Sequence, residues 1–348
     1  MRRLNTSITW LVRFVLISLA FILGACSRAT ESPTPTPTIT PIVSPSPFPT
    51  RTPTPYPLAS SENPLVLGIV SETNDQQAST AAEELTQILA RITNYHMRSH
   101  TYTKYSDLLT DLKAGKVHIV FLQPFTYLWA RDRSLVEPAF LTNHFGVYQY
   151  GGQFLANVSS NFTLYFDPAK GLNTTNAGIA LQQFENKRPC FVDPTSASGY
   201  VVPLGLLGEQ GISVKAGVIP QSHTSVVRAL YINGICDFGA TFATTGDPRT
   251  ASAITQDLTD VMNRVVVIYQ IDPIIPNLNI SFHSSVPKLM RDDLSFAMQA
   301  LVKDQKQLFS TANNYEISDL QPADDTVYDP LRKYLLYSGV RLDTLVGK

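Results

Sequence analysis

Short apolar runs alternate with amphipathic segments along most of the chain, beginning at residue 64. The run at 64–70 (PLVLGIV) is rich in branched apolar residues, which is typical of a buried strand. Apolar residues then recur at helical spacing over 79–92, so the pattern predicts a helix after this strand. Strands are also predicted over 95–102 and 117–122, with a helix around 108–112 between them. This alternation predicts a parallel sheet with helices on both faces.

The alternation begins again near residue 152, which indicates a second α/β unit inserted into the first. Its predicted elements are an extended segment over 152–157, helices over 177–185, 201–207 and 225–232, and strands over 189–193, 214–219 and 235–241. A strand over 264–270 leads back, and helices over 291–308 and 329–337 complete the first unit.

This organisation predicts two α/β lobes. Lobe 1 is expected to comprise residues 64–151 and 269–348, and lobe 2 residues 152–268. Two extended crossings, near Tyr150 and Gln270, would then join the lobes. Because open parallel sheets bind ligands at the carboxyl ends of their strands, a ligand cleft is expected between the lobes.

The first 63 residues lack this pattern. Residues 1–25 combine three arginines with a short apolar run, as a secretory signal peptide does, and are too short and too charged for a comfortable membrane span. Small residues then precede Cys26, and this segment resembles the lipobox of bacterial lipoproteins, in which the cysteine is lipidated. Residues 26–63 are rich in Pro, Thr and Ser, which predicts an extended tether. We therefore expect an extracytoplasmic protein anchored to the membrane through Cys26; an ordinary cleaved signal is the alternative.

Composition and charge narrow the class of protein. The chain has 348 residues, of which 44% are hydrophobic and 16% charged, so it is long and apolar enough for two domains. Its 27 basic and 28 acidic residues leave no excess positive charge, and nucleic acid is not an expected partner. With three Cys, six His and no C-x-x-C spacing, no metal and no cofactor are expected.

Four segments carry the strongest functional signal. They are 103–127 (TKYSDLLTDLKAGKVHIVFLQPFTY), 193–203 (DPTSASGYVVP), 222–230 (SHTSVVRAL) and 234–241 (GICDFGAT). In this order they resemble motifs of the phosphate/phosphonate-binding, PhnD-like family of periplasmic substrate-binding proteins. The resemblance implies a type II periplasmic-binding-protein fold. It also implies a lipoprotein that captures phosphate, phosphite or a phosphonate and delivers it to the permease of an ABC importer, without enzymatic activity and as a monomer.

The resemblance also implies a set of ligand-binding residues. A loop before a helix would offer hydroxyls and backbone N–H groups at the positive end of the helix dipole, and further contacts would come from the other motifs. The implied residues are Tyr105, Gln123, Tyr127, Tyr150, Thr195, Ser196, Ser198, Gly199 and His223.

Other interpretations of these residues stay open. In the alternative interpretation, Thr195 or Ser196 only caps the following helix, as such residues do at helix starts in general, and His223 lies in a surface turn. Tyr127 would serve equally well in the core, and Gln123 would cap a turn.

Departures from the family pattern bear on the ligand. Ala197 stands where the family has a hydroxyl. Receptors for aminoethylphosphonate carry carboxylates after the segment matching 234–241 and after the one ending at Pro276, whereas this chain has Phe242 and Asn277 there. These differences favour an oxyanion with an uncharged substituent over an aminophosphonate.

Three alternative functions deserve comparison. Ser198, His223 and Asp237 suggest a hydrolase triad, but the serine lacks the G-x-S-x-G context of a nucleophile elbow, so no enzyme is expected. A ferric-ion receptor of the same fold would use several tyrosines, and the chain has 15 with no adjacent pair. A sensory lipoprotein would need the same cleft as a transport protein.

Cys190 and Cys236 begin what look like adjacent parallel strands. Export to an oxidising compartment allows a disulfide, but pairing across neighbouring parallel strands is geometrically awkward. Two buried free thiols are therefore favoured, with a disulfide as the alternative.

Overall fold

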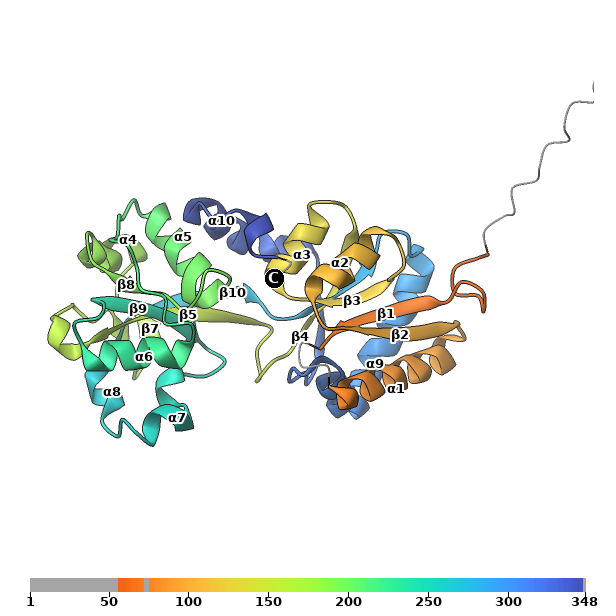
Figure 1. The fold of residues 1–348 in the computed structure, drawn as a ribbon, viewed down its shortest axis with the longest axis horizontal. Helices are drawn as coiled ribbons and strands as arrows, with labels where there is room; N and C mark the ends of the chain where they lie inside the picture. The colour runs from red at the N-terminus through yellow and green to blue at the C-terminus, as the bar shows by residue number, and fades with distance from the viewer. Residues whose placement is uncertain (1–55, 72–74, 347–348) are drawn as a thin grey trace, which may run out of the picture. The chain divides into compact units, whose positions relative to one another are not determined.

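Lobe 1 is built on a six-stranded sheet in the computed structural model, which describes residues 56–71 and 75–346. Its elements are β1 (Leu65–Val70), α1 (Gln76–Thr93), β2 (Met97–Tyr102), α2 (Tyr105–Lys113), β3 (Ile119–Leu122), α3 (Pro124–Arg131), β4 (Val136–Thr142), β11 (Asn279–His283), α9 (Lys288–Asn313) and β12 (Leu320–Pro322). The strand order is β12-β4-β11-β3-β1-β2. Figure 1 shows β1, β2, β3 and β4 of this sheet. Alternate residues of β1 face two apolar clusters, since Leu65 and Leu67 pack towards α1 and α9 and Val66 packs towards α2.

Lobe 2 is built on a four-stranded sheet of order β10-β5-β9-β8. Its elements are β5 (Gln149–Asn157), η1 (Val158–Ser160), β6 (Phe166–Asp167), β7 (Leu172–Asn173), α4 (Ala177–Ala180), η2 (Leu181–Phe184), β8 (Pro189–Cys190), the π-helical turn η3 (Ala197–Val201), α5 (Val202–Glu209), α6 (His223–Ile232), β9 (Phe238–Ala243), η4 (Pro248–Thr250), α7 (Ser252–Thr255), α8 (Val261–Arg264) and β10 (Val265–Pro276). Strands β6 and β7 form a separate two-stranded sheet.

The sheets are mixed, whereas the sequence pattern predicted parallel ones. β1 pairs in parallel with β2 and β3, but β11 pairs antiparallel with β3 and β4. The pattern missed β11 because Asn279 and Ser281 are polar and yet fully buried, with the Asn279 side chain donating to Tyr328 and accepting from Ser281. The strand predicted over 214–219 is reduced to one bridge between Val218 and Cys190.

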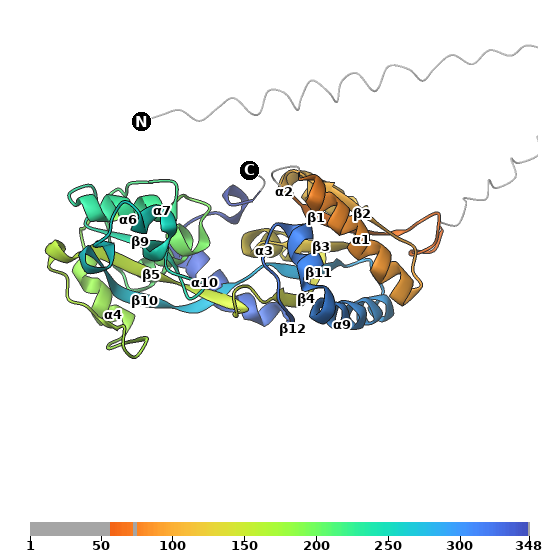
Figure 2. The ribbon, with the colours of Figure 1, turned by 90° about the horizontal axis from the view of Figure 1, so that it is seen from below.

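The chain crosses between the two sheets at residues 143–148 and 277–278. These positions follow from the antiparallel pairing of β5 with β10, which runs from Asn157↔Val265 to Gln149↔Pro276 (Figure 2). The lobe boundaries expected from the sequence, 151/152 and 268/269, fall inside these two strands. The crossings therefore lie closer to the lobe 1 sheet than the sequence pattern suggested.

The C-terminal segment, residues 325–346, contacts both lobes, although the sequence assigned it to lobe 1. It comprises η5 (Asp325–Tyr328), α10 (Asp329–Ser338) and η6 (Leu342–Thr344). α10 packs on α5 of lobe 2, where any side chain at Gly205 would clash with the backbone of Tyr334 (Figure 1). η6 packs on α3 of lobe 1, where Trp129 Nε1 donates to Asp343 Oδ1 at 2.9 Å. The segment therefore forms a third connection between the lobes.

Two earlier expectations concern residues outside or at the edge of the described part. The expected signal peptide and the expected lipidation site at Cys26 lie outside the described residues, as does most of the expected tether. Residues 57–63, expected to belong to the tether, form turns that contact lobe 1, where the His96 N–H donates to the Ala59 carbonyl at 3.1 Å. None of the helices within 56–71 and 75–346 has both the length and the apolar character needed to cross a bilayer.

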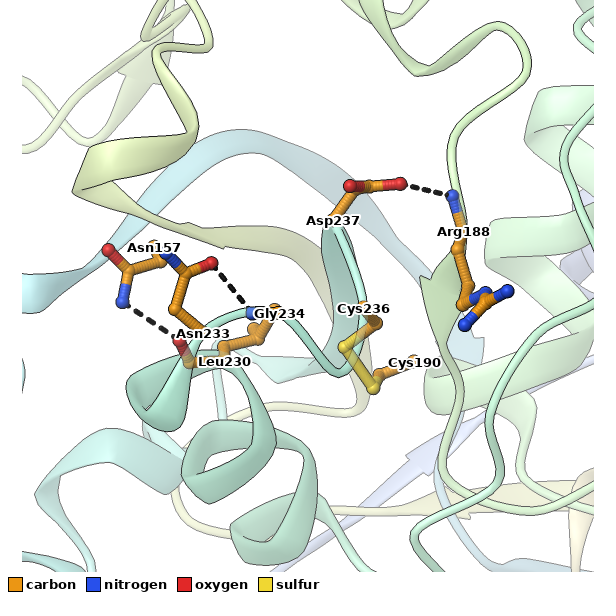
Figure 3. The surroundings of a disulfide bond; sticks show 8 residues. All are labelled: Asn157, Arg188, Cys190, Leu230, Asn233, Gly234, Cys236 and Asp237. Atoms are coloured by element: carbon orange, nitrogen blue, oxygen red, sulfur yellow. Dashed lines mark hydrogen bonds between the residues drawn. A yellow bond between two sulfur atoms is a disulfide. The ribbon is translucent and has the colours of Figure 1, made fainter.

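Cys190 and Cys236 form a disulfide, so the preference for free thiols was wrong (Figure 3). Cys236 does not lie in the strand as expected; it precedes β9, in the turn after α6. The Cα atoms are 5.6 Å apart, within the range that a disulfide requires. Next to it, the Arg188 N–H donates to the Asp237 carboxylate at 2.6 Å and fixes the same turn. The prediction had argued that a disulfide between two paired residues of neighbouring parallel strands is awkward. This argument does not apply, because Cys236 does not belong to a strand.

Replacing both cysteines with alanine is expected to lower the free energy of unfolding by about 2–4 kcal/mol, because the bond restricts the unfolded chain across a separation of 46 residues. Urea unfolding of the full chain, followed by circular dichroism, measures this difference. A reductant should destabilise the wild type by a similar amount and leave the double variant unchanged. Equal midpoints for the oxidised wild type and the double variant would contradict the expectation.

A buried histidine makes the stability of lobe 1 depend on pH. His118 is 5% exposed, and its Nδ1 accepts a hydrogen bond from the Val66 N–H at 3.0 Å. Burial, with a smaller contribution from His283, lowers the pKa of His118 to about 4. Because the unfolded state takes up this proton near pH 6.5 and the folded state near 4, stability falls as the pH falls between these values.

His118→Asn keeps an acceptor for the Val66 N–H and removes the titrating group. The loss of unfolding free energy between pH 6.5 and 4.5 is expected to be smaller in this variant than in the wild type, by about 2–3 kcal/mol. Urea titrations at the two pH values test this. The same pH dependence in both proteins would rule out His118 as a source of the acid lability.

Candidate functional site

A cavity of about 580 Å³ is lined by residues of both lobes and of the second crossing. Seven of the nine residues implied by the family resemblance line it, namely Tyr105, Gln123, Tyr150, Thr195, Ser196, Ser198 and His223. These residues come from α2, the turn before α3, β5, the loop after β8 and the start of α6. The structure thus brings together residues that are up to 118 positions apart in the sequence, as between Tyr105 and His223.

The loop at 193–199, between β8 and α5, is shaped by its own side chains. Asp193 Oδ1 accepts from the backbone N–H of Thr195 at 2.7 Å and from its hydroxyl at 2.5 Å. Ser196 Oγ accepts from the Gly199 N–H at 3.1 Å and thereby caps the helix that begins at Ala197. These local bonds define the loop's conformation, as the helix-capping interpretation of Ser196 anticipated.

The start of this helix offers unused hydrogen-bond donors to the cavity. Among the described residues, the backbone N–H groups of Ala197 and Ser198 have no protein acceptor. The π-helical turn η3 continues directly into α5, so the helix runs from Ala197 to Glu209 with its positive end at the cavity. Because Ser196 Oγ accepts from Gly199, its own hydroxyl hydrogen is available to a ligand.

His223 is held in one tautomer. Its Nδ1 accepts from the Phe242 N–H at 3.2 Å, so the proton of the neutral ring is on Nε2. Burial lowers the pKa of His223 to about 4, against a smaller opposing effect of Asp193. The ring is therefore neutral near pH 7 and serves as an N–H donor in the cavity wall.

Tyrosine hydroxyls provide further neutral donors. Burial raises the pKa of Tyr150 to about 12, while a hydrogen bond from Ser198 acts in the opposite direction. The pKa of Tyr315, another lining residue, is raised by burial and by its proximity to Tyr150. Both phenols therefore stay protonated over the physiological pH range.

The described residues that line the cavity combine polar and apolar side chains. Among the described residues that line it, none carries a carboxylate, an ammonium or a guanidinium group. In the described parts of the chain, no cluster of three or more His, Cys, Asp or Glu has the arrangement of a metal site. The site can therefore offer a ligand oriented dipoles and hydrogen bonds rather than a counter-charge.

Two of the nine implied residues do not line the cavity. Tyr127 is 0% exposed, and its hydroxyl donates to Asp325 Oδ1 at 2.6 Å while its ring packs on Tyr328. The structure thus places Tyr127 in the core, the alternative that the sequence left open. Gly199 lies behind the loop, where its N–H bonds to Ser196 and a side chain would clash with Val192.

The hydrolase alternative finds no support in this geometry. Asp237 accepts from the Arg188 N–H beside the disulfide and is not among the residues lining the cavity (Figure 3). In a catalytic triad a carboxylate accepts a hydrogen bond from Nδ1 of the histidine, whereas Nδ1 of His223 itself accepts from the Phe242 N–H. Ser198 hydrogen-bonds to Tyr150.

Sequence reasoning missed several lining residues on the lobe 1 side. They include Ser71, Asn277, Asn314, Tyr315, Leu345 and Val346. The sequence analysis considered Asn277 only as a position where some relatives carry a carboxylate. Tyr315 follows a helix and belongs to none of the four motifs. Leu345 and Val346 belong to the C-terminal segment, which the sequence pattern assigned to lobe 1 without naming any site residue in it.

Comparisons with known proteins agree with this arrangement. A family model described as "ABC transporter, phosphonate, periplasmic substrate-binding protein" matches residues 67–328. The phosphate-import protein PhnD of Mycolicibacterium smegmatis is 26% identical over 197 residues, which cover 53% of this chain and 56% of that protein. The chain thus spans about half the length of this curated relative.

Solved structures support the same fold. XAC2383 from Xanthomonas citri, solved bound to ATP, has a TM-score of 0.58 at 14% identity, covering 81% of this chain and 98% of that one. Mh-p37 from Mycoplasma hyorhinis has a TM-score of 0.51 at 8% identity, covering 79% and 98%. At such identities the likeness shows the fold alone.

Two α/β lobes around a shared cavity define a type II periplasmic-binding-protein fold, which confirms the predicted fold class. The chain belongs to the family of periplasmic phosphonate-binding proteins of ABC transporters. The family resemblance seen in the sequence is confirmed. This is a family of transport proteins, not of enzymes.

Gly199→Ala is expected to destabilise the protein by about 1–3 kcal/mol, because the added methyl would overlap Val192 beneath the loop. Adding Val192→Gly removes both Val192 atoms that the methyl would overlap, Cγ2 and Cβ, so the double variant should lose less than the sum of the two single losses. Urea unfolding of the wild type, both single variants and the double variant measures this coupling. Strictly additive losses would show that the two side chains do not compete for space.

Proposed function

We propose that this protein is an extracytoplasmic solute-binding protein that captures a phosphorus oxyanion, namely phosphate, phosphite or a phosphonate, and delivers it to the permease of an ABC importer. One observation carries the proposal. The free N–H groups of Ala197 and Ser198, at the positive end of a helix, line the same cavity as the Nε2–H of His223. Membership of the phosphonate-binding family supports the same ligand class.

Uncharged donors suit an oxyanion that must be bound reversibly. Backbone N–H groups and hydroxyls form charge-assisted hydrogen bonds with anionic oxygens, and a helix start favours negative charge. Gln123, whose side chain does not cap α3, and Ser196 add donors from opposite lobes. Because the hydrogen-bond donors come from both lobes, all of them can contact one ligand only when the lobes are closed. Ligand binding would therefore favour the closed form.

The lack of charged side chains among the described lining residues also favours a ligand with an uncharged substituent. An ammonium group on the ligand needs a carboxylate or several acceptors to replace its hydration, and the described lining residues include no carboxylate. Phosphate, phosphite and alkylphosphonates are therefore proposed over aminophosphonates.

The remaining parts of the proposal concern location and assembly. A signal peptide at 1–25 and a lipidated Cys26 would place the protein outside the cytoplasm and tether it to the membrane through residues 26–63. Tethering raises the effective concentration of a monomeric receptor near its permease.

Methylphosphonate, phosphate or phosphite is expected to raise the thermal midpoint of the full chain, purified in mild detergent, because a ligand that binds the folded state stabilises it. Ser196→Ala and His223→Gln should each weaken binding by about tenfold or more, since each removes a donor to a charged group. Isothermal titration calorimetry gives the dissociation constants.

Ser225→Ala is the matched control for the loss of a hydroxyl, because Ser225 belongs to α6 but does not line the cavity. Aminoethylphosphonate should bind at least tenfold more weakly than methylphosphonate. Sulfate and ferric citrate test the alternative ligands. Stabilisation by ferric citrate alone, or by none of the phosphorus compounds, would overturn the proposed ligand class.

A further inference from the structure

The two crossings between the lobes are bonded to each other at Asn277. Its backbone N–H donates to the Tyr148 carbonyl at 3.0 Å, and its Nδ2 donates to the Val147 carbonyl at 2.8 Å. Tyr148 and Val147 belong to the first crossing, and Asn277 to the second. Because Asn277 is 1% exposed, water does not replace these bonds, and losing one would leave a buried polar group unpaired. The crossings are therefore held together as one unit.

Tyr315, in the loop between α9 and β12 of lobe 1, holds this unit from the lobe 1 side. Its hydroxyl donates to Asn277 Oδ1 at 3.1 Å and accepts from the N–H of Leu278. Its ring stacks on His144 of the first crossing, with ring centroids 3.9 Å apart and planes inclined by 14°. One side chain from lobe 1 thus contacts both crossings, through its ring and through its hydroxyl.

This contact lies in the wall of the ligand cavity, since Asn277, Leu278 and Tyr315 all line it. We propose that Tyr315 and Asn277 form the pivot of lobe closure, and that Tyr315 is a positioning residue that sets the angle between the lobes for ligand capture. The effect on ligand affinity rests on the proposed function; the effect on the lobe angle does not.

The physical reason lies in the length of the crossings. The first crossing, 143–148, contains a turn closed by a bridge between His144 and Val147, and the second, 277–278, is two residues long. Without the bonds at Asn277 the two crossings would move independently, and the lobes would sample more angles. A ligand would then bind tightly in a small fraction of these arrangements, and its apparent affinity would fall by that fraction. The pivot keeps the donors of the two lobes near the arrangement that a ligand needs.

Tyr315→Phe removes the hydroxyl and keeps the stacked ring. We expect a broader distribution of lobe-to-lobe distances in the absence of ligand. We also expect about 5- to 20-fold weaker binding of every ligand that the wild type binds, with the order of ligand preference unchanged. Single-molecule energy transfer on the full chain measures the distribution, with dyes on non-canonical residues at the exposed positions Glu84 and Lys187 of the two lobes.

Tyr102→Phe is the matched control, because this buried hydroxyl donates to Asp111 at 3.1 Å entirely within lobe 1. It should leave the distance distribution and the affinity unchanged. His144→Leu is the second variant, and it should broaden the distribution by removing the stacked ring. It also keeps the inference testable if Tyr315→Phe does not fold.

The outcomes separate the two proposals. A ligand-free distribution in Tyr315→Phe as narrow as in the wild type would overturn the pivot, and a loss of affinity alone would then make Tyr315 a direct ligand contact. If the wild type binds no phosphorus oxyanion, the proposed function fails, while the ligand-free comparison still decides whether the pivot exists.

Discussion

The antiparallel pairing of β5 with β10 is the interaction on which both the lobes and the cavity depend. β5 carries the chain into lobe 2 and β10 carries it out beside β5, so both crossings meet the sheet at the same end, at Gln149 and Pro276. This pairing places Tyr150 opposite Ile275 and brings Asn277 within hydrogen-bonding distance of Tyr148. Strand pairing in one lobe therefore determines where the cavity wall and the pivot lie.

Binding a multiply charged anion without a counter-charge requires donors that are already oriented and have no partner in the protein. The 193–199 loop meets this requirement through short-range bonds: Asp193 fixes the turn and Ser196 caps the helix, which leaves the next two backbone N–H groups free. His223 is oriented in the same way, by a backbone donor on its other nitrogen. The arrangement costs little ordering of side chains when the ligand arrives, because most of these donors belong to the backbone or to fixed rings.

The sequence predicted the parts of the site that arise from short-range structure. Ser196, Ser198 and His223 belong to contiguous motifs at helix starts, which placed them near the cavity, while the orientation of His223 depends on the Phe242 N–H in β9. The sequence left Tyr127 open between the cavity and the core, because the long-range bond from its hydroxyl to Asp325, which holds it in the core, has no local signal. Tyr315 and Asn277 were missed for the same reason, since their bond joins residues 38 positions apart. The disulfide was misjudged because β9 begins at Phe238, three residues later than predicted, which leaves Cys236 in the preceding turn.

The two crossings and the C-terminal segment connect the lobes through different kinds of contact. The pivot is buried and made of directional bonds to backbone groups. The C-terminal connection packs α10 on α5 of lobe 2 and η6 on α3 of lobe 1. Asp325, at its start, accepts from Tyr127 of lobe 1; burial alone would raise the pKa of Asp325, and Arg332 and Tyr127 hold it below its usual value. Lobe closure that rotates about Asn277 and Tyr315 therefore has to move the C-terminal segment as well, because that segment contacts both lobes.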